Sequence, residues 1–143
     1  INKFCIINIR NFKLINYFNE KFDMENIDII IQTVIALGIF NVWIIRLNKP
    51  SIYRGGDSKN MESEFKAYGF NNSVMKIIGF SKLSLACLLL AGIWFPALVN
   101  PSAILMSFLM VGAIWVHFKI NDPLIKSLPA FILLSLCLFL IIF

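Results

Sequence analysis

An uncharged stretch covers residues 83–116 and contains no Asp, Glu, Lys, Arg or His. It is interrupted once, by a turn-forming segment between Pro96 and Pro101. Each apolar run beside this break has roughly the length that an α-helix needs to cross the ~30 Å hydrocarbon core of a bilayer. Because helices satisfy their own backbone polar groups in lipid, we interpret the stretch as a transmembrane helical hairpin.

The composition of the whole chain also indicates a membrane protein. Of 143 residues, 59% are hydrophobic and only 15% are charged, which is too little charge to cover a soluble domain of this length. The sequence therefore predicts an all-α fold, an integral membrane four-transmembrane-helix bundle within residues 24–143. The four candidate spans are residues 27–46, 74–95, 102–118 and 124–143.

Residues 1–23 differ from the rest of the chain because they mix Asn, Ile, Lys and Phe without a continuous apolar core. They are a poor signal peptide. Since Met24 begins a more ordinary sequence, we interpret Met24 as the start of translation and the upstream segment as untranslated. An amphipathic helix at the membrane interface is the alternative interpretation.

The hydrophilic connection after the first span contains one amphipathic segment. Three large side chains recur there at spacings of four and three residues, namely Met61, Phe65 and Tyr68. This spacing predicts a short surface or re-entrant helix. We expect it to begin at Ser58 or Asn60 and to stop at Gly69.

Two residue pairs predict where the last two spans begin. Asn100 precedes Pro101, and Asp122 precedes Pro123. Asn and Asp are favoured as helix N-caps, and proline is favoured in the first helical turn. We therefore expect Asn100 and Asp122 to cap the third and fourth spans.

The basic residues predict how the chain is oriented. They gather in the long connection, on its flanks and in the last turn, whereas residues 95–101 contain none. By the positive-inside rule, both basic loops should be cytoplasmic. The formal net charge of +5 does not indicate nucleic acid, because lysines and arginines at span ends orient helices and meet anionic lipid. The expected partner of this surface is the lipid bilayer.

Lys82 and His117 are the candidate functional residues of the spans. Lys82 either faces the bundle interior, as a charge for an anion or a carbonyl group, or extends its stem to the cytoplasmic headgroups. His117 either relays protons at the cytoplasmic mouth or is an ordinary interface residue beside a tryptophan. Both alternatives stay open at the level of the sequence.

The turn formed by Arg54, Gly55, Gly56 and Asp57 is a third candidate site. Two glycines expose backbone N–H groups beside a guanidinium, an arrangement that can hold an anion or a headgroup phosphate. The alternative is a plain turn.

No catalytic or metal-binding motif accompanies these residues. Cys5, Cys87 and Cys137 have neither disulfide-framework nor redox-dithiol spacing, and His117 has no metal-ligand cluster around it. No nucleophile and base can be paired, and no phosphate-binding loop is present. We therefore expect no catalytic centre within the chain itself and no metal.

Three segments carry a family resemblance: NVWIIRLNKPSIYRGGDSKNMESEFKAYGF, GFSKLSLACLLLAGIW and GAIWVHFKINDPLIKSLPAFILL. They resemble the DoxX-like family of small four-helix membrane proteins, and the resemblance extends over residues 24–143. The family takes its name from a membrane subunit of a thiosulfate:quinone oxidoreductase. The resemblance implies a membrane subunit in quinone-linked redox metabolism of the bacterial inner (cytoplasmic) membrane, with quinone as ligand and a redox enzyme as partner.

On this reading Lys82, His117 and residues 54–57 would line the cytoplasmic side of a quinone or anion site. The main alternative is a non-enzymatic assembly partner, which binds other membrane proteins through small-residue helix faces. A small-molecule transporter is a third hypothesis, although four short spans leave little room for a central pathway without oligomerisation. A homo-oligomer is therefore also considered.

Overall fold

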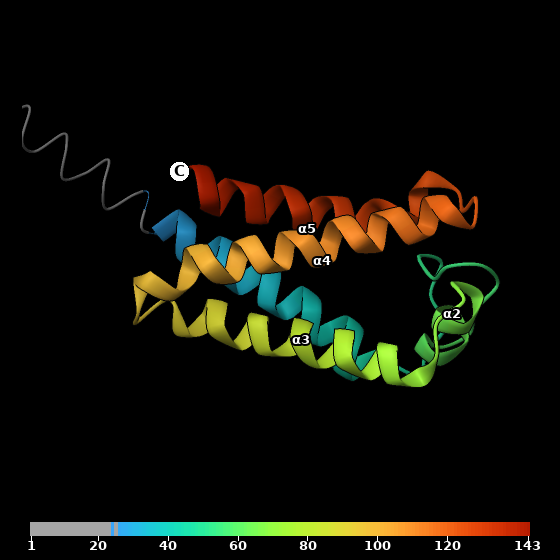
Figure 1. Cartoon of the computed structure of the whole chain (residues 1–143). Coiled ribbons are helices and arrows are strands. Elements are labelled where there is room, and N and C mark those ends of the chain that lie inside the picture. The colour runs from blue at the N-terminus through green and yellow to red at the C-terminus, as the bar shows by residue number, and fades with distance from the viewer. Residues whose placement is uncertain (1–23, 25) are drawn as a thin grey trace, which may run out of the picture.

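The structure is a computed structural model that describes residue 24 and residues 26–143. Both interpretations of residues 1–23 lie outside the described residues. The described chain forms helices and their connections, and four of its helices are long and apolar enough to cross a membrane (Figure 1). The predicted all-α, four-helix membrane bundle is thereby confirmed.

The first spanning helix, Asn26–Ile45, ends in a π-helical turn, η1 (Asn41–Ile45). The N–H of Arg46 closes this turn on the carbonyl of Asn41, at 2.9 Å. π-Helical turns widen the helix locally and are frequent at functional sites. Here the turn carries Trp43, whose side chain is buried among the other helices.

A helical hairpin follows, made of α3 (Asn72–Ala91), η2 (Pro96–Leu98) and α4 (Val99–Lys119). The start of α3 lies before the predicted residue 74 because the side chain of Asn71 caps it, accepting a hydrogen bond from the N–H of Val74. The expected cap at Asn100 is wrong, since the 3₁₀ turn η2 already leads the chain into α4 at Val99.

The last helix, α5 (Leu124–Ile142), packs antiparallel along α4 (Figure 1). Its predicted start at residue 124 is confirmed, but the expected capping role of Asp122 is wrong. Pro123 occupies the N-cap position, and no side chain caps the helix. The carboxylate of Asp122 points to other partners, which form part of the site described below.

The predicted short helix exists as α2 (Met61–Ala67). Asn60 and Ser63 form a reciprocal capping box at its start, and Gly69 follows its end with a φ of +85°. The face predicted to lie on the membrane surface instead packs against the bundle, where the rings of Phe65 and Trp43 are 6.0 Å apart. In Figure 1, α2 lies at the same end of the bundle as the α4–α5 turn, which we call the loop end.

Small residues let these helices approach closely. A Cβ atom at Gly79 would lie 2.4 Å from the Trp43 ring, and one at Gly92 would lie 2.6 Å from Val99. Only glycine fits such contacts without displacing the neighbour. Gly79 and Gly92 therefore serve helix contacts within the chain, and these two small residues are not available to the helices of partner proteins.

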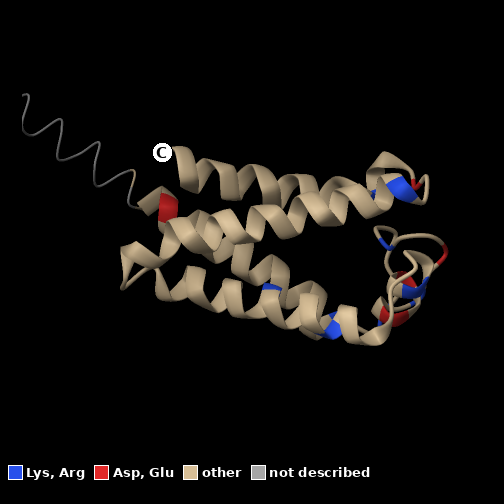
Figure 2. Cartoon of the chain, viewed as in Figure 1, with Lys and Arg blue, Asp and Glu red and all other residues tan. Residues whose placement is uncertain are grey.

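Most of the charged residues gather at the loop end (Figure 2). The basic residues of this end lie in the long connection, at the start of α3 and around the α4–α5 turn; they are Arg46, Lys49, Arg54, Lys59, Lys66, Lys76, Lys119 and Lys126. Their distribution is the one from which we predict a cytoplasmic loop end. The orientation itself stays a prediction.

Candidate functional site

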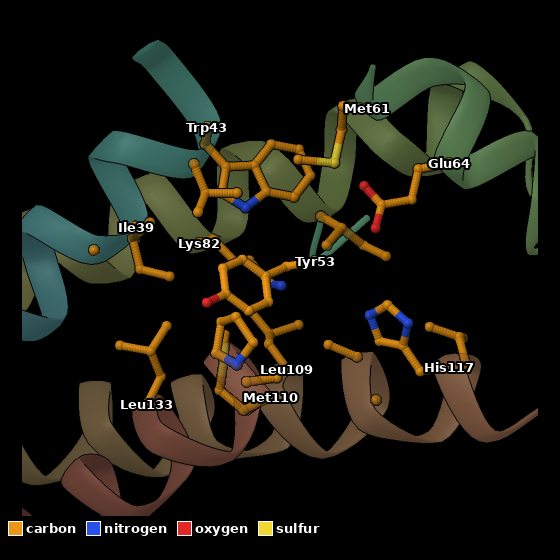
Figure 3. A pocket seen from close by; sticks show the side chains of 18 of the residues that line it. Ile39, Trp43, Tyr53, Met61, Glu64, Lys82, Leu109, Met110, His117 and Leu133 are labelled. Atoms are coloured by element: carbon orange, nitrogen blue, oxygen red, sulfur yellow. The ribbon is translucent and has the colours of Figure 1, made fainter. Parts of the chain in front are cut away.

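A cavity of about 610 Å³ lies inside the bundle toward the loop end. All four spanning helices, α2 and the long connection contribute to its wall, which is mostly apolar and includes Ile39, Leu109, Met110 and Leu133 (Figure 3). Some wall residues also face the surrounding lipid, such as Val34, which is 49% exposed. The cavity wall therefore includes residues on the outer surface of the bundle.

Lys82 of α3 lies in the wall of this cavity and is only 9% exposed. Its ammonium group is 5.6 Å from the centroid of the Trp43 ring, a cation–π contact. Within the part of the chain that the structure describes, the ammonium has neither a hydrogen-bond acceptor nor an ion-pair partner. Of the two alternatives from sequence, the structure has the interior position (Figure 3).

Arg54 is held differently, because its guanidinium is saturated by the protein. Its Nη1 donates to Oε2 of Glu64 at 2.7 Å, and its Nε donates to the carbonyl of Lys49 at 2.9 Å. Its Nη2 donates to the carbonyls of Arg46 and Leu47, where the first helix ends. Both charged side chains are buried, so the pair ties the long connection and α2 to the end of the first helix.

The two glycines of the predicted anion-binding turn bind carboxylates of the same chain. The N–H of Gly55 donates to Oε1 of Glu64 at 2.8 Å, and that of Gly56 donates to Oδ1 of Asp122 at 3.0 Å. The turn thus has the predicted chemistry, but internal carboxylates occupy its donors. Asp57 is exposed and makes none of these contacts.

A chain of hydrogen bonds continues from Glu64 to the α4–α5 turn. The hydroxyl of Tyr68 donates to Oε1 of Glu64 at 2.8 Å, and its oxygen lies 3.3 Å from Nε2 and 3.5 Å from Nδ1 of His117. Nδ1 of His117 is 2.8 Å from Oδ2 of Asp122. Lys126 closes the network by donating to Oδ1 of Asp122 and to the carbonyl of Gly56, at 3.1 and 2.6 Å.

The surroundings of Tyr68 and Asp122 shift their pKa values in opposite directions. Burial, together with the nearby charge of Glu64, raises the pKa of Tyr68 far above its usual range, so the phenol stays neutral. Burial also opposes ionisation of Asp122. Hydrogen bonds from His117, Lys126 and the Gly56 backbone outweigh that effect and lower the pKa of Asp122.

Sequence reasoning placed Arg54, Gly55, Gly56 and His117 in the candidate site, and the structure brings these four into one network. Lys82 lines the same cavity without a hydrogen bond to that network, and Asp57 lies apart from both. The network members that sequence reasoning missed are Glu64, Tyr68, Asp122 and Lys126.

A signal for Glu64 was present in the sequence. Glu64 lies three residues after Met61 and four before Tyr68, on the apolar face of a predicted helix. A carboxylate on a face that becomes buried requires a cation or several donors. That requirement pointed to Arg54, the nearest arginine in the same connection.

No metal centre is part of this arrangement. Within residue 24 and residues 26–143, no three His, Cys, Asp or Glu side chains are grouped to hold a metal ion. Cys87 and Cys137 are free thiols. The chemistry that the described side chains offer is hydrogen bonding, together with a buried ammonium group, that of Lys82, which has no acceptor and lies beside an apolar cavity.

Comparisons with known proteins assign the chain to a family. No curated protein matches it, and no solved structure matches it. A family model, described as the DoxX-like family, matches residues 51–140, which include α2, α3, α4 and nearly all of α5. Since this match covers more than half of the chain, and since the four spans fit a membrane bundle, the protein is an integral membrane member of the DoxX-like family.

Proposed function

We propose that this protein is a membrane subunit of a quinone-linked redox system and that the cavity beside Lys82 is its quinone site. The observation that supports the proposal is a buried ammonium group, without an acceptor in the described chain, at the wall of an apolar cavity. An uncompensated charge at membrane depth is costly and usually marks a ligand site. A quinone has the matching chemistry, since it combines carbonyl oxygens with an apolar ring and tail.

Each part of the wall has a role in this proposal. The ammonium of Lys82 donates a hydrogen bond to a carbonyl oxygen of the head group, and the ring of Trp43 positions that ammonium through the cation–π contact. The apolar side chains of Leu109, Met110 and Leu133 contact the ring and the first part of the tail. The quinone supplies the redox chemistry when bound, and electrons come from a partner redox enzyme, because the described residues hold no metal centre or disulfide.

The proposal includes a location. The loop end, with its basic residues, faces the cytoplasm of a bacterial cell, and the protein resides in the inner membrane. A cytoplasmic redox enzyme would then meet α2 and the long connection. These surfaces surround the polar side of the cavity.

The test is purification of the tagged protein from its own membranes in mild detergent, with quinone and copurifying proteins quantified by mass spectrometry. We expect near-stoichiometric quinone with the wild type. Lys82→Met, which keeps the length and removes the charge, should lose most of it. Lys76→Met is the matched control, because Lys76 lies on the same helix but is exposed. Wild-type protein without quinone would refute the proposed site.

The alternative function, an assembly partner without a small-molecule site, has one supporting feature. Gly112 of α4 is exposed, although it also belongs to the cavity wall, and a Cβ atom there would meet no atom of another element within 4 Å, so this position has room for a neighbouring helix. In that case Lys82→Met would retain all copurifying membrane proteins, and Gly112→Leu would lose them. The quinone proposal expects a redox enzyme among the copurified proteins and the loss of quinone in Lys82→Met.

A further inference from the structure

The geometry points to a window between α3 and α4, at Gly112, through which the apolar tail of a bound ligand leaves the cavity for the lipid. The inference rests on the proposed function in one respect, since the ligand is a quinone whose head group lies at Lys82. The window itself is formed by the helices of this chain. It adds a route for the tail to the proposed head-group site.

The two helices that frame the window separate toward the loop end. They are joined by the short η2 turn and diverge from there along their length (Figure 1). Close to that turn, Ala86 of α3 and Ala103 of α4 belong to one apolar core cluster, and both are 0% exposed. Nearer the loop end, Ile78 and Lys82 of α3 line the cavity instead. The cavity therefore lies on the loop-end side of the closely packed part of α3 and α4.

One face of α4 belongs both to the cavity wall and to the outer surface of the bundle. Phe108, Gly112 and Trp115 recur on this face at spacings of four and three residues, and all three line the cavity. All three are also exposed, Phe108 by 71% and Trp115 by 60%. A long aromatic side chain can reach from one surface to the other, but glycine has no side chain. At Gly112, therefore, the cavity is continuous with the outer surface.

The space beside Gly112 distinguishes it from Gly38 of the first helix, which also lines the cavity. A Cβ atom at Gly112 would meet no atom of another described element within 4 Å. A Cβ atom at Gly38 would lie 3.5 Å from Cδ2 of Leu133 in α5, which is an ordinary van der Waals contact. The first helix is therefore packed against α5 at Gly38, whereas α4 is open at Gly112.

The window lies at the depth of the lipid tails. At the loop end, the ammonium of Lys119 is 5.8 Å from the ring centroid of Phe70 and 5.9 Å from that of Trp115. These contacts connect the end of α4 with the residues that lead into α3. Gly112 lies seven residues before Lys119 in α4, which places it about 10 Å deeper along the helix. The window therefore opens toward acyl chains rather than toward headgroups.

An apolar tail is the part of a ligand that fits this window. The wall side chains nearest to Gly112 in sequence or on the facing helix are apolar, namely Phe108, Trp115 and Ile78. Lys82 lies one turn of α3 beyond Ile78, so a head group at Lys82 directs its tail past Ile78 and Gly112. The cavity, at about 610 Å³, has the size of a site for a small ligand. A longer tail therefore has to continue outside it.

The first readout is the dissociation constant of one quinone head group in two forms, without a tail and with a decyl tail, for the full chain in lipid nanodiscs. Gly112→Phe fills the window with a ring and leaves Lys82 in place. We expect it to weaken binding of the decyl form about tenfold or more, as if about two methylene groups lost their burial. The tailless form should bind as it binds the wild type. If Gly112→Phe does not fold, Gly112→Leu replaces it.

The matched control is Val111→Phe. Val111 is the neighbour of Gly112 on α4 and is 51% exposed, but it stands outside the cavity wall that the described residues form. Both forms of the quinone should bind Val111→Phe as they bind the wild type. Because the decyl form partitions equally into the lipid of every sample, a difference between the two variants reports on the window.

The second readout needs no quinone and uses the fluorescence of Trp43, which lines the cavity and is 8% exposed. The sequence has three tryptophans, so Trp94→Phe and Trp115→Phe leave Trp43 alone and keep aromatic rings at the other two positions. Phosphatidylcholine with brominated acyl chains quenches a tryptophan that its chains contact. In the ligand-free protein we expect this lipid to quench Trp43. Adding Gly112→Phe should remove most of the quenching, and adding Val111→Phe should not.

The outcomes separate the two proposals. If both forms bind the wild type and Gly112→Phe binds the decyl form equally well, the window is wrong and the quinone site stands. If neither form binds any of the proteins, the proposed function fails, and the quenching of Trp43 alone decides the window. Equal quenching in Gly112→Phe and its parent then overturns the window. A loss of quenching in Gly112→Phe but not in Val111→Phe supports it, with a phospholipid chain as its occupant in place of the quinone tail.

Discussion

The guanidinium of Arg54 and the carboxylate of Glu64 form an ion pair at 2.7 Å, buried between the long connection and α2. A backbone carbonyl also accepts a hydrogen bond from Arg54, and a backbone N–H donates to Glu64. These backbone groups carry no net charge, so each charged side chain depends on the other for its counter-ion. The pair therefore fixes the wall of the cavity at the loop end. Its removal should affect stability before it affects any chemistry.

Replacing Glu64 with Gln leaves the Arg54 charge buried without its counter-ion. We expect the free energy of unfolding to fall by about 3–5 kcal/mol, the usual cost of breaking a buried pair on one side. Thermal and denaturant unfolding in detergent measure this change. Glu62→Gln is the matched control, because Glu62 forms an exposed i,i+4 pair with Lys66 and its loss should change stability little. Equal effects of both changes would contradict the buried-pair interpretation.

Gly55 is the second point at which the loop end should be sensitive. A Cβ atom there would lie 2.3 Å from the hydroxyl oxygen of Tyr68, which the hydrogen bond to Glu64 holds in place. We expect Gly55→Ala to destabilise the protein by about 1–3 kcal/mol through this clash. Gly112→Ala provides the control, since a Cβ at Gly112 meets no atom within 4 Å. A Gly55→Ala protein with wild-type unfolding behaviour would rule out the close approach.

The fold was largely predictable from the sequence, for physical reasons. Spans are long apolar runs because lipid imposes that composition, and α2 follows from helical spacing after a capping residue. The predicted N-caps at Asn100 and Asp122 were wrong, because the capping preference of Asn and Asp was outweighed by other contacts of the chain. Asn100 lies within a helix that had already begun, and Asp122 serves His117 and Lys126.

The site was predictable only in part, because its contacts join residues far apart in the chain. Gly56 meets Asp122 across 66 positions, and Tyr68 meets His117 across 49. Spanning helices are apolar on all sides, so their sequences do not indicate which face meets which neighbour. The same ambiguity left two positions open for Lys82 until the packing was known.

Acidification should weaken the network through Asp122. Its pKa is lowered in the folded protein. Its contribution to stability is therefore present above the unfolded pKa, which is near the ordinary aspartate value of 3.8, and is lost as the pH falls through the folded pKa. We expect the melting temperature of the wild type to fall below about pH 4. Asp122→Asn should have a lower melting temperature at neutral pH and a flatter decline on acidification.

The control for this prediction is Asp57→Asn, because Asp57 is exposed and outside the network. Its melting temperatures should follow those of the wild type across the whole pH range. The curve for Asp122→Asn should converge with the wild-type curve at low pH, where both lack the carboxylate charge. Parallel curves that never converge would show that the asparagine acts through packing rather than through the charge.

The orientation of the bundle is the last prediction. Eight basic residues at the loop end, and none in residues 95–101, predict a cytoplasmic loop end. In a cysteine-free background, Lys59→Cys and Ala97→Cys place one exposed thiol at each end. A membrane-impermeant maleimide added to intact spheroplasts should label Ala97→Cys, and Lys59→Cys should be labelled only after the membrane is opened. The reverse pattern would place the cavity on the outer side, where no cytoplasmic redox partner could reach it.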